Sequence, residues 1–190
     1  MGSNYYLIAQ LPYLVYEQKP PMSSEYFRDL AGRHVSKNDN DLFKYLTSEF
    51  DNTDKTGCDF IDGYRDWELA LRQNLAVQRS IKSKRDIPIK EASFDMGAAA
   101  AALKAIDEKS PLDAELFLDK ARWNAIDELA GSNNFCRNYI YAYFLKLLLI
   151  ERREAFNEEK GFSEYKSLYA SILELHDEME RVKESQGEHT

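Results

Sequence analysis

Asp113–Phe156 carries the strongest structural signal in this chain of 190 residues. It begins with the charged, amphipathic segment Asp113-Ala-Glu-Leu-Phe-Leu-Asp-Lys-Ala-Arg-Trp-Asn-Ala-Ile-Asp-Glu-Leu129. After a short polar break it continues with Phe135-Cys-Arg-Asn-Tyr-Ile-Tyr-Ala-Tyr-Phe-Leu-Lys-Leu-Leu-Leu-Ile-Glu-Arg-Arg153. The second segment is apolar around most of its helical circumference, and such a helix has to be enclosed by other helices. We therefore predict that this pair lies at the centre of an all-α fold.

Helix signals continue on the N-terminal side of the pair. Ser110-Pro111 predicts where its first helix begins, because serine suits the N-cap and proline suits the first helical position. The alanine-rich run Met96–Ile106 predicts a helix that a neighbour can approach closely. Before it, apolar residues recur at helical spacing over Phe60–Arg85 and predict one long helix.

The remaining helices are short or lie near the C-terminus. One is predicted from Ser23 or Ser24 to Leu30, with Gly32 as its stop. A second runs to Phe50 from Asn38 or Asp39. The apolar helix is expected to be capped by Asn133 or Asn134 and to continue to about Lys160, before Gly161. Ser163 then caps a final amphipathic helix, whose apolar residues are Tyr165, Leu168, Tyr169, Ile172, Leu175 and Met179, and residues after Lys183 should fray.

The N-terminal segment Asn4–Tyr16 is rich in aromatic residues and is interrupted by Pro12. Its periodicity leaves two alternatives open, a short extended segment or an aromatic arm that lies over the helices. Lys19-Pro20-Pro21 then forces a non-helical corner. The whole chain is thus expected to form a compact bundle of about seven helices with an aromatic N-terminal arm.

The size and charge of the chain limit its organisation and its partners. A chain of 190 residues suffices for one all-helical domain, or for two subdomains, residues 1–90 and 91–190. The net charge of −8 disfavours broad contact with nucleic acid or anionic lipid, since both need concentrated positive charge. Two basic clusters, Lys82–Arg85 and Arg152–Arg153, each lie near a predicted helix C-terminus, where the helix dipole favours cations.

The cysteines and the apolar runs predict a soluble, reduced, cytoplasmic protein. Cys58 and Cys136 are not part of a close-spaced metal or redox motif, although a disulfide between them stays open. The N-terminus lacks the pattern of a signal peptide. Tyr139–Ile150, the longest apolar run, is too short to span a bilayer and contains Lys146.

Motifs for catalysis are absent from the sequence. His34, His176 and His189 lie far apart, and none has a histidine four residues away, as a helical zinc site requires. No phosphate-binding glycine loop of the P-loop or dinucleotide type occurs. We therefore expect no enzyme activity, no cofactor and no metal. An enzyme whose site is assembled only in space is the remaining catalytic alternative.

Two further patterns have a structural and a functional interpretation. The loop Asn52–Gly63 alternates oxygen-bearing residues as a calcium loop does, but Gly63 stands where an EF-hand needs a glutamate, so a polar turn is favoured. Tyr139, Tyr141 and Tyr143 could form a platform for stacking bases. On a helix these tyrosines spread around the surface, which favours packing in a core or an interface.

The order of these helices resembles the C-subunit family of V-type ATPases, whose eukaryotic members are named with the letter d. Glu115-Leu-Phe-Leu-Asp-Lys-Ala-Arg-Trp123 is similar to a Leu-Asp-x-Ala-Tyr/Trp helix of that family, and Arg137-Asn-Tyr139 leads into an apolar helix that ends in arginines. Trp67–Lys82 is similar to a degenerate earlier copy of the second element. Asn4–Pro12, Lys19–Ser24 and Trp67–Arg79 resemble, more closely, an uncharacterised bacterial family encoded among V-type ATPase genes.

This resemblance implies a function in a rotary ATPase complex. Proteins of the C-subunit family are all-helical, are built from repeated helical modules and link the central stalk to the membrane rotor ring. The resemblance therefore implies a non-catalytic accessory, coupling or assembly subunit of a bacterial V-type ATP synthase. Its partners would be central-stalk or rotor-ring proteins, and its place the cytoplasm or the inner-membrane periphery. A freestanding helical adaptor with an unrelated partner is the alternative. The candidate interaction residues are Arg72, Arg79, Arg152 and Arg153, since exposed arginines often anchor interfaces.

Overall fold

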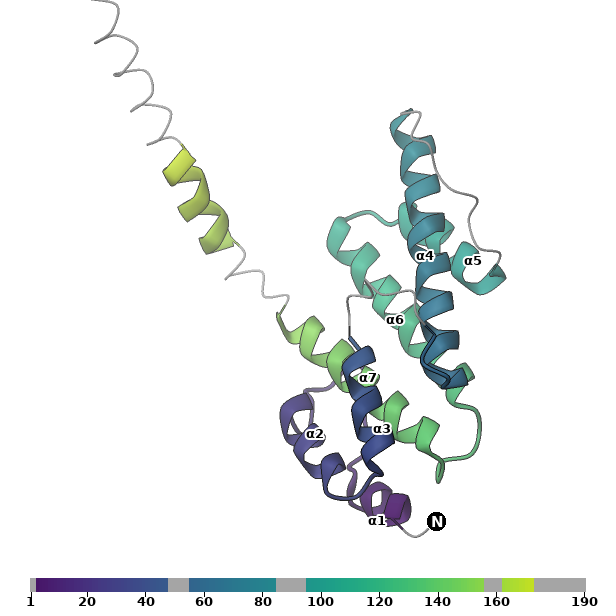
Figure 1. The fold of residues 1–190 in the computed structure, drawn as a ribbon. Coiled ribbons are helices and arrows are strands. Elements are labelled where there is room, and N and C mark those ends of the chain that lie inside the picture. Colours follow the sequence, from purple (N-terminus) through teal and green to yellow (C-terminus); the bar gives the residue numbers. More distant parts are fainter. Residues whose placement is uncertain (1–2, 48–54, 85–94, 156–161, 173–190) are drawn as a thin grey trace, which may run out of the picture. The chain divides into compact units, whose positions relative to one another are not determined.

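The computed structural model describes residues 3–47, 55–84, 95–155 and 162–172. These ranges contain helices and no strand, which confirms the all-α prediction. The elements in chain order are α1 Ser3–Gln10, α2 Ser24–Gly32, α3 Lys37–Leu42, a 3-10 helix Phe43–Tyr45, α4 Asp59–Ser83, α5 Met96–Ile106, α6 Pro111–Ala130 and α7 Arg137–Ala155 (Figure 1). A further helical segment covers residues 162–172. The chain divides into two compact units, Met1–Arg153 and Glu154–Thr190.

The first unit contains a layer of α4, α5 and α6 that packs through small side chains. Ala98, Ala101, Ala102 and Ala105 of α5 are all buried. They form one apolar cluster with Leu71 and Leu75 of α4 and Leu118 of α6, among others. An alanine surface lets neighbouring backbones approach closely, as the sequence predicts. Asp95 and Ser110 cap α5 and α6 through their side-chain oxygens.

The second and larger cluster surrounds α7. Its buried residues run from Ile140 to Ile150, interrupted by the partly buried Lys146 and Leu148. Phe27 of α2 stacks on the rings of Tyr143 and Phe144, with centroids 5.3 and 5.7 Å apart. The prediction that this helix is core is confirmed, and so is the packing role of Tyr141 and Tyr143. In the parts of the chain that are described, no helix is long and apolar enough to cross a membrane.

The start of α7 corrects the predicted boundary. The helix begins at Arg137, two residues after Phe135, and neither Asn133 nor Asn134 caps it. The side-chain Oδ1 of Asn133 instead accepts a hydrogen bond from the backbone N–H of Phe135 at 3.0 Å, which closes a turn before the helix. The predicted continuation to Lys160 and Gly161 lies outside the described residues.

The N-terminal segment also differs from one of its two alternatives. Residues 3–10 form α1 rather than an extended segment, because Leu7 is buried on one side of a helical turn. Pro12 lacks the N–H that would continue the helix. The following non-helical residues lie against the helices, where Leu14 and Tyr16 are buried in the larger core cluster. The arm is therefore half helix and half irregular chain.

The short helices confirm their existence and correct some of their ends. Ser23 is the N-cap of α2 and accepts from the N–H of Tyr26, and Gly32 is its last residue. The next helix begins earlier than Asn38 or Asp39, because Ser36 accepts from the N–H of Asp39 and caps it. It tightens into a 3-10 turn from Phe43, and Phe50 lies outside the described residues.

The long helix α4 and the helical segment of the second unit also differ from their predicted ends. The helix α4 begins one residue before Phe60 and is described to Ser83, with Lys84 in the left-handed region at φ 52° as its C-cap. Arg85 is not among the described residues. In the second unit Phe162 is already helical, so Ser163 lies inside the segment 162–172 and does not cap it. Leu175, Met179 and Lys183 lie outside the described residues.

Replacing Ala102 with leucine tests the close packing of α5. The larger side chain is expected to lower the free energy of unfolding by about 1–3 kcal/mol, because added methylenes in a packed core displace their neighbours. The same change at Ala100, which is exposed on the same helix, should alter it by less than about 0.5 kcal/mol. Urea unfolding followed by circular dichroism measures both values, and equal effects would contradict the packing of α5.

Candidate interaction surfaces

A buried ion-pair network joins α4, α6 and α7. Arg122 of α6 holds Glu68 of α4 with two hydrogen bonds, from Nε to Oε2 at 3.0 Å and from Nη2 to Oε1 at 3.2 Å. Its Nη1 donates to Oδ1 of Asp119 at 2.8 Å. All three side chains are buried. Because a buried charge without its partner is costly, this network fixes how α4 and α6 face each other.

Two of the predicted interaction arginines belong to this network. Arg72 Nε pairs with Oε1 of Glu68 at 2.9 Å, one turn away on α4. Arg152 of α7 donates from Nη1 to Oδ1 of Asp119 at 3.1 Å and from Nη2 to Oε2 of Glu115 at 2.9 Å. Both guanidinium groups therefore have intramolecular partners, and their first task is to hold helices together.

Asp119 is the most deeply buried charge of the network. Its Oδ2 has no hydrogen-bond partner among the described residues. Desolvation raises the pKa of its carboxyl, although Arg152 and Arg122 act in the opposite direction. Desolvation also raises the pKa of the Tyr64 hydroxyl, and the negative charge of Glu68 adds to that shift. Burial between packed helices is thus the physical cause of both shifts.

The other two predicted arginines lie apart from the network. Arg153 of α7 donates hydrogen bonds to the backbone oxygens of Tyr16 and Gln18, and its guanidinium carbon lies 5.2 Å from the centre of the Tyr16 ring. It therefore fastens the irregular N-terminal chain to α7. Arg79 is exposed on α4 and lines a hollow of about 280 Å³ together with Ile106 and Pro111. Of the four predicted residues, Arg79 is the one placed at a surface hollow.

An exposed aromatic patch lies where α1 meets the loop between α6 and α7. It consists of Tyr5, Tyr6 and Phe135, whose exposed fractions are 56%, 66% and 62%. The rings of Tyr5 and Phe135 stack with centroids 5.6 Å apart and an interplanar angle of 23°. Tyr6 meets Tyr5 edge to face at 6.2 Å. Rings that pack together while remaining exposed form a preorganised apolar surface.

A cavity of about 290 Å³ borders this aromatic patch. Its lining includes Asn134, the chain neighbour of Phe135, and Trp123 at its apolar side. Lys146 also lines the cavity, with its Nζ 4.5 Å from the centre of the Trp123 ring, and forms an ion pair with Asp127. The patch therefore adjoins a hollow with both an aromatic wall and a charge pair at its rim.

The aromatic patch is not among the sites predicted from the sequence. A signal for it existed, because Phe135 is a large apolar residue that directly follows the polar break Gly131–Asn134. Tyr5 and Tyr6 are adjacent, and adjacent residues of a helix cannot both face the same core. Only the fold brings these two positions together, since about 130 residues separate them in the chain.

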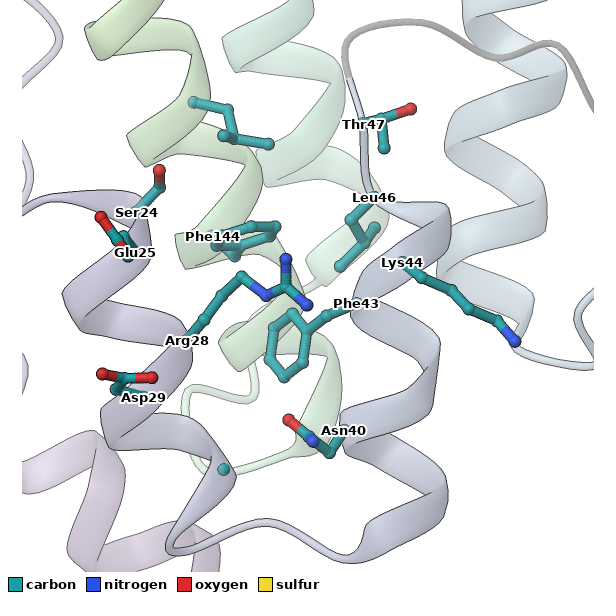
Figure 2. A pocket seen from close by; sticks show the side chains of 12 residues that line it. Ser24, Glu25, Arg28, Asp29, Asn40, Phe43, Lys44, Leu46, Thr47 and Phe144 are labelled. Carbon is teal, nitrogen blue, oxygen red and sulfur yellow. The ribbon is translucent and has the colours of Figure 1, made fainter.

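A second groove, of about 850 Å³, runs between α2 and the segment 37–47, with α7 behind it (Figure 2). Phe43 and Phe144 supply apolar lining, and Arg28 extends toward the centre of the groove between them. Glu25, Asp29 and Lys44 lie at its sides, so charges of both signs surround it. This mixture favours no single class of small ligand.

An apolar stripe of five residues runs along the helical segment 162–172 in the second unit. Its members are between 53% and 63% exposed and are Phe162, Tyr165, Leu168, Tyr169 and Ile172. The rings of Tyr165 and Tyr169 stack at 6.1 Å, one helical turn apart. Helical spacing places Ser163 and Ser167 on the opposite side. The sequence predicted this amphipathic pattern, and the structure leaves its apolar side exposed.

The remaining sequence predictions concern a loop and two cysteines. Both oxygens of Asp62 accept hydrogen bonds, Oδ1 from the N–H and hydroxyl of Thr56 and Oδ2 from the N–H of Gly57. The described part of the Asn52–Gly63 loop is therefore a polar turn. Cys58 and Cys136 are free thiols, so no disulfide joins them. Within the described ranges, no three potential metal-ligating side chains converge.

Comparison with known protein families gives a match to part of the chain. The family model described as "Protein of unknown function (DUF2764)" matches residues 90–175. This range includes α5, α6, α7 and the segment 162–172. No curated protein and no solved structure matches the chain significantly. The description of the family assigns no activity, so a function has to be inferred from the residues themselves.

Replacing Arg122 with methionine tests the ion-pair network. The change keeps much of the side-chain volume but leaves Glu68 without its buried partner, and it is expected to lower the free energy of unfolding by about 3–5 kcal/mol. The same replacement at the exposed Arg79 is the matched control and should change it by less than about 0.5 kcal/mol. Chemical denaturation of both variants provides the measurement. A loss below about 1 kcal/mol for the Arg122 variant would show that the network contributes little.

The Asp62 turn predicts a pH dependence. Desolvation opposes the charge of Asp62, but the hydrogen bonds from Thr56 and Gly57 outweigh it and lower the pKa of the carboxyl below its ordinary value of 3.8. A lowered folded-state pKa stabilises the protein above the unfolded value, and this contribution is lost as the pH falls through the folded value. The wild type should therefore exceed D62N in stability at pH 7, and the difference should shrink below pH 3.8. Urea unfolding between pH 7 and 3 measures the trend, and a difference that is constant with pH would refute it.

Proposed function

We propose that this chain is a non-catalytic accessory subunit of a bacterial V-type ATP synthase, acting in coupling or in assembly. The proposal starts from the resemblance of Trp67–Lys82, Glu115–Trp123 and the apolar helix to modules of the C-subunit family. Its partners are proteins of the central stalk or the membrane rotor ring. It works in the cytoplasm, at the periphery of the inner membrane when it is bound to the complex.

The observation that carries the protein-binding part of this proposal is the aromatic patch with its bordering cavity. Tyrosine and phenylalanine are enriched in protein interfaces, where rings bury a large area at low cost in conformational entropy. Tyr5 and Phe135 are already stacked, so little ordering is needed when a partner covers them. The adjacent cavity can receive a side chain of the partner, as interface pockets do.

The environments of the arginines favour this surface over the charged end of α7. Arg152 and Arg153 make hydrogen bonds within the chain, and their loss would disturb the fold as well as any interface. The aromatic patch lies near the opposite end of α7, where the exposed rings have no comparable structural duty. We therefore place the docking surface at the start of α7.

The alternative is a freestanding adaptor that uses the same aromatic patch for an unrelated partner. An exposed, preorganised apolar surface supports both functions equally, because it defines a kind of contact and not an identity. The two proposals differ in what the protein should carry with it when it is isolated from its own cells.

Affinity purification of the tagged chain from its native host, followed by native mass spectrometry, tests the proposal. We expect V-type ATPase proteins at near-stoichiometric amounts in the wild type. Replacing Tyr6 and Phe135 with serine should reduce their recovery roughly thirty-fold or more, since truncated hot-spot aromatics cost about 2 kcal/mol or more each. Met96→Ser is the matched control, because Met96 is an apolar residue of α5 with an exposed fraction of 76%.

The outcomes separate the two functions. A stoichiometric partner unrelated to ATPases, lost in the double variant, would replace the accessory function by the adaptor. Unchanged recovery in the double variant would remove the aromatic patch from the interface. Circular dichroism of the variants verifies that their helical content is preserved.

A further inference from the structure

The apolar stripe of the segment 162–172 has a spacing that a globular core does not require. Tyr165, Leu168 and Ile172 are separated by three and then four residues, and each is more than half exposed. The sequence continues this alternation with Leu175, Met179 and Val182. Apolar residues that recur every three and four positions over about three heptads are typical of a coiled coil.

We propose that this stripe pairs with the same stripe of a second copy of the chain, as a parallel two-stranded coiled coil. In heptad terms Tyr165, Ile172 and Met179 occupy the a positions, and Leu168, Leu175 and Val182 occupy the d positions. A β-branched residue at a with leucine at d favours a parallel dimer. Ile172 lies between Leu168 and Leu175 in this arrangement.

Charge placement agrees with two identical chains as the occupants. No charged residue stands at an a or d position between Tyr165 and Val182, so two copies meet without repulsion along the seam. Glu178 stands at a g position and Lys183 at the e position five residues later. In a parallel, in-register pair these are the two positions that form salt bridges between helices.

The composition of the second unit supports pairing outside the chain's own core. Residues 154–190 form a compact unit of their own, and among them the stripe is the described apolar surface. The helix exposes its apolar side and carries serines on the other, so its stability requires a partner for that side. A second copy supplies an identical face of matching length.

This inference does not depend on the proposed ATPase function, since the aromatic patch belongs to the first unit and the stripe to the second. A dimer would present two aromatic patches to its partners. Loss of ATPase proteins from the native preparation would leave the dimer intact, and loss of the dimer would leave the patch intact, so the two ideas fail separately.

Sedimentation equilibrium of the full-length chain measures the oligomeric state. The wild type is expected to approach twice the monomer mass of 22.1 kDa as concentration rises. I172D places a charge in the seam and should give the monomer mass over the same concentrations, whereas S167D on the opposite side should remain dimeric. A wild type that is monomeric or trimeric, or an I172D variant that stays dimeric, would overturn the proposal. Circular dichroism verifies that the first unit of I172D is folded.

Cysteine cross-linking tests the orientation. In a C136S background, which leaves only the buried Cys58, L168C places a thiol at a d position. Mild oxidation should yield a covalent dimer from L168C, because a parallel register brings the two copies of residue 168 together. S167C, which faces away from the seam, should give at least ten-fold less. Antiparallel pairing, or docking of the stripe on a different protein, would separate the two thiols and leave L168C monomeric under denaturing electrophoresis.

Discussion

Arg122 joins three helices through one guanidinium group. Two of its nitrogens hold Glu68 of α4, and the third holds Asp119, which also receives Arg152 of α7. Helices packed only through alanine and leucine can slide or rotate with little change in buried area, but charges removed from water must keep their partners. The network therefore fixes the register of α4, α6 and α7, on which the shape of the first unit depends.

The aromatic core around α7 supplies the apolar complement of this network. Phe27, Tyr143 and Phe144 are buried in contact with one another, and the Tyr141 hydroxyl donates to Asp39 at 3.1 Å. Large rings with polar ends fill space and satisfy their hydroxyl groups at the same time. With α7 held by rings along its length and by Arg152 and Arg153 at its end, the loop at Phe135 takes a defined position beside α1.

Much of the fold could be predicted, and less of the candidate site. Helix periodicity and caps are local, so α4, α5 and α6 were identified from sequence, with Asp95 and Ser110 at two of their starts. The start of α7 was misplaced because Asn133 uses its side chain in a preceding turn. The interaction arginines were chosen for exposure, but sequence does not reveal that Asp119 and Glu115 would hold Arg152.

The sequence by itself determined an all-α chain, the central place of its apolar helix and the amphipathic pattern of residues 162–172. These follow from spacing along a helix, which is a property of neighbouring residues. Only the tertiary structure decided that α1 carries Tyr5 to Phe135, and that Glu68 and Arg122, 54 residues apart, share a buried ion pair. Contacts between distant residues depend on how whole helices pack, and no local pattern in the chain encodes the path that brings them together.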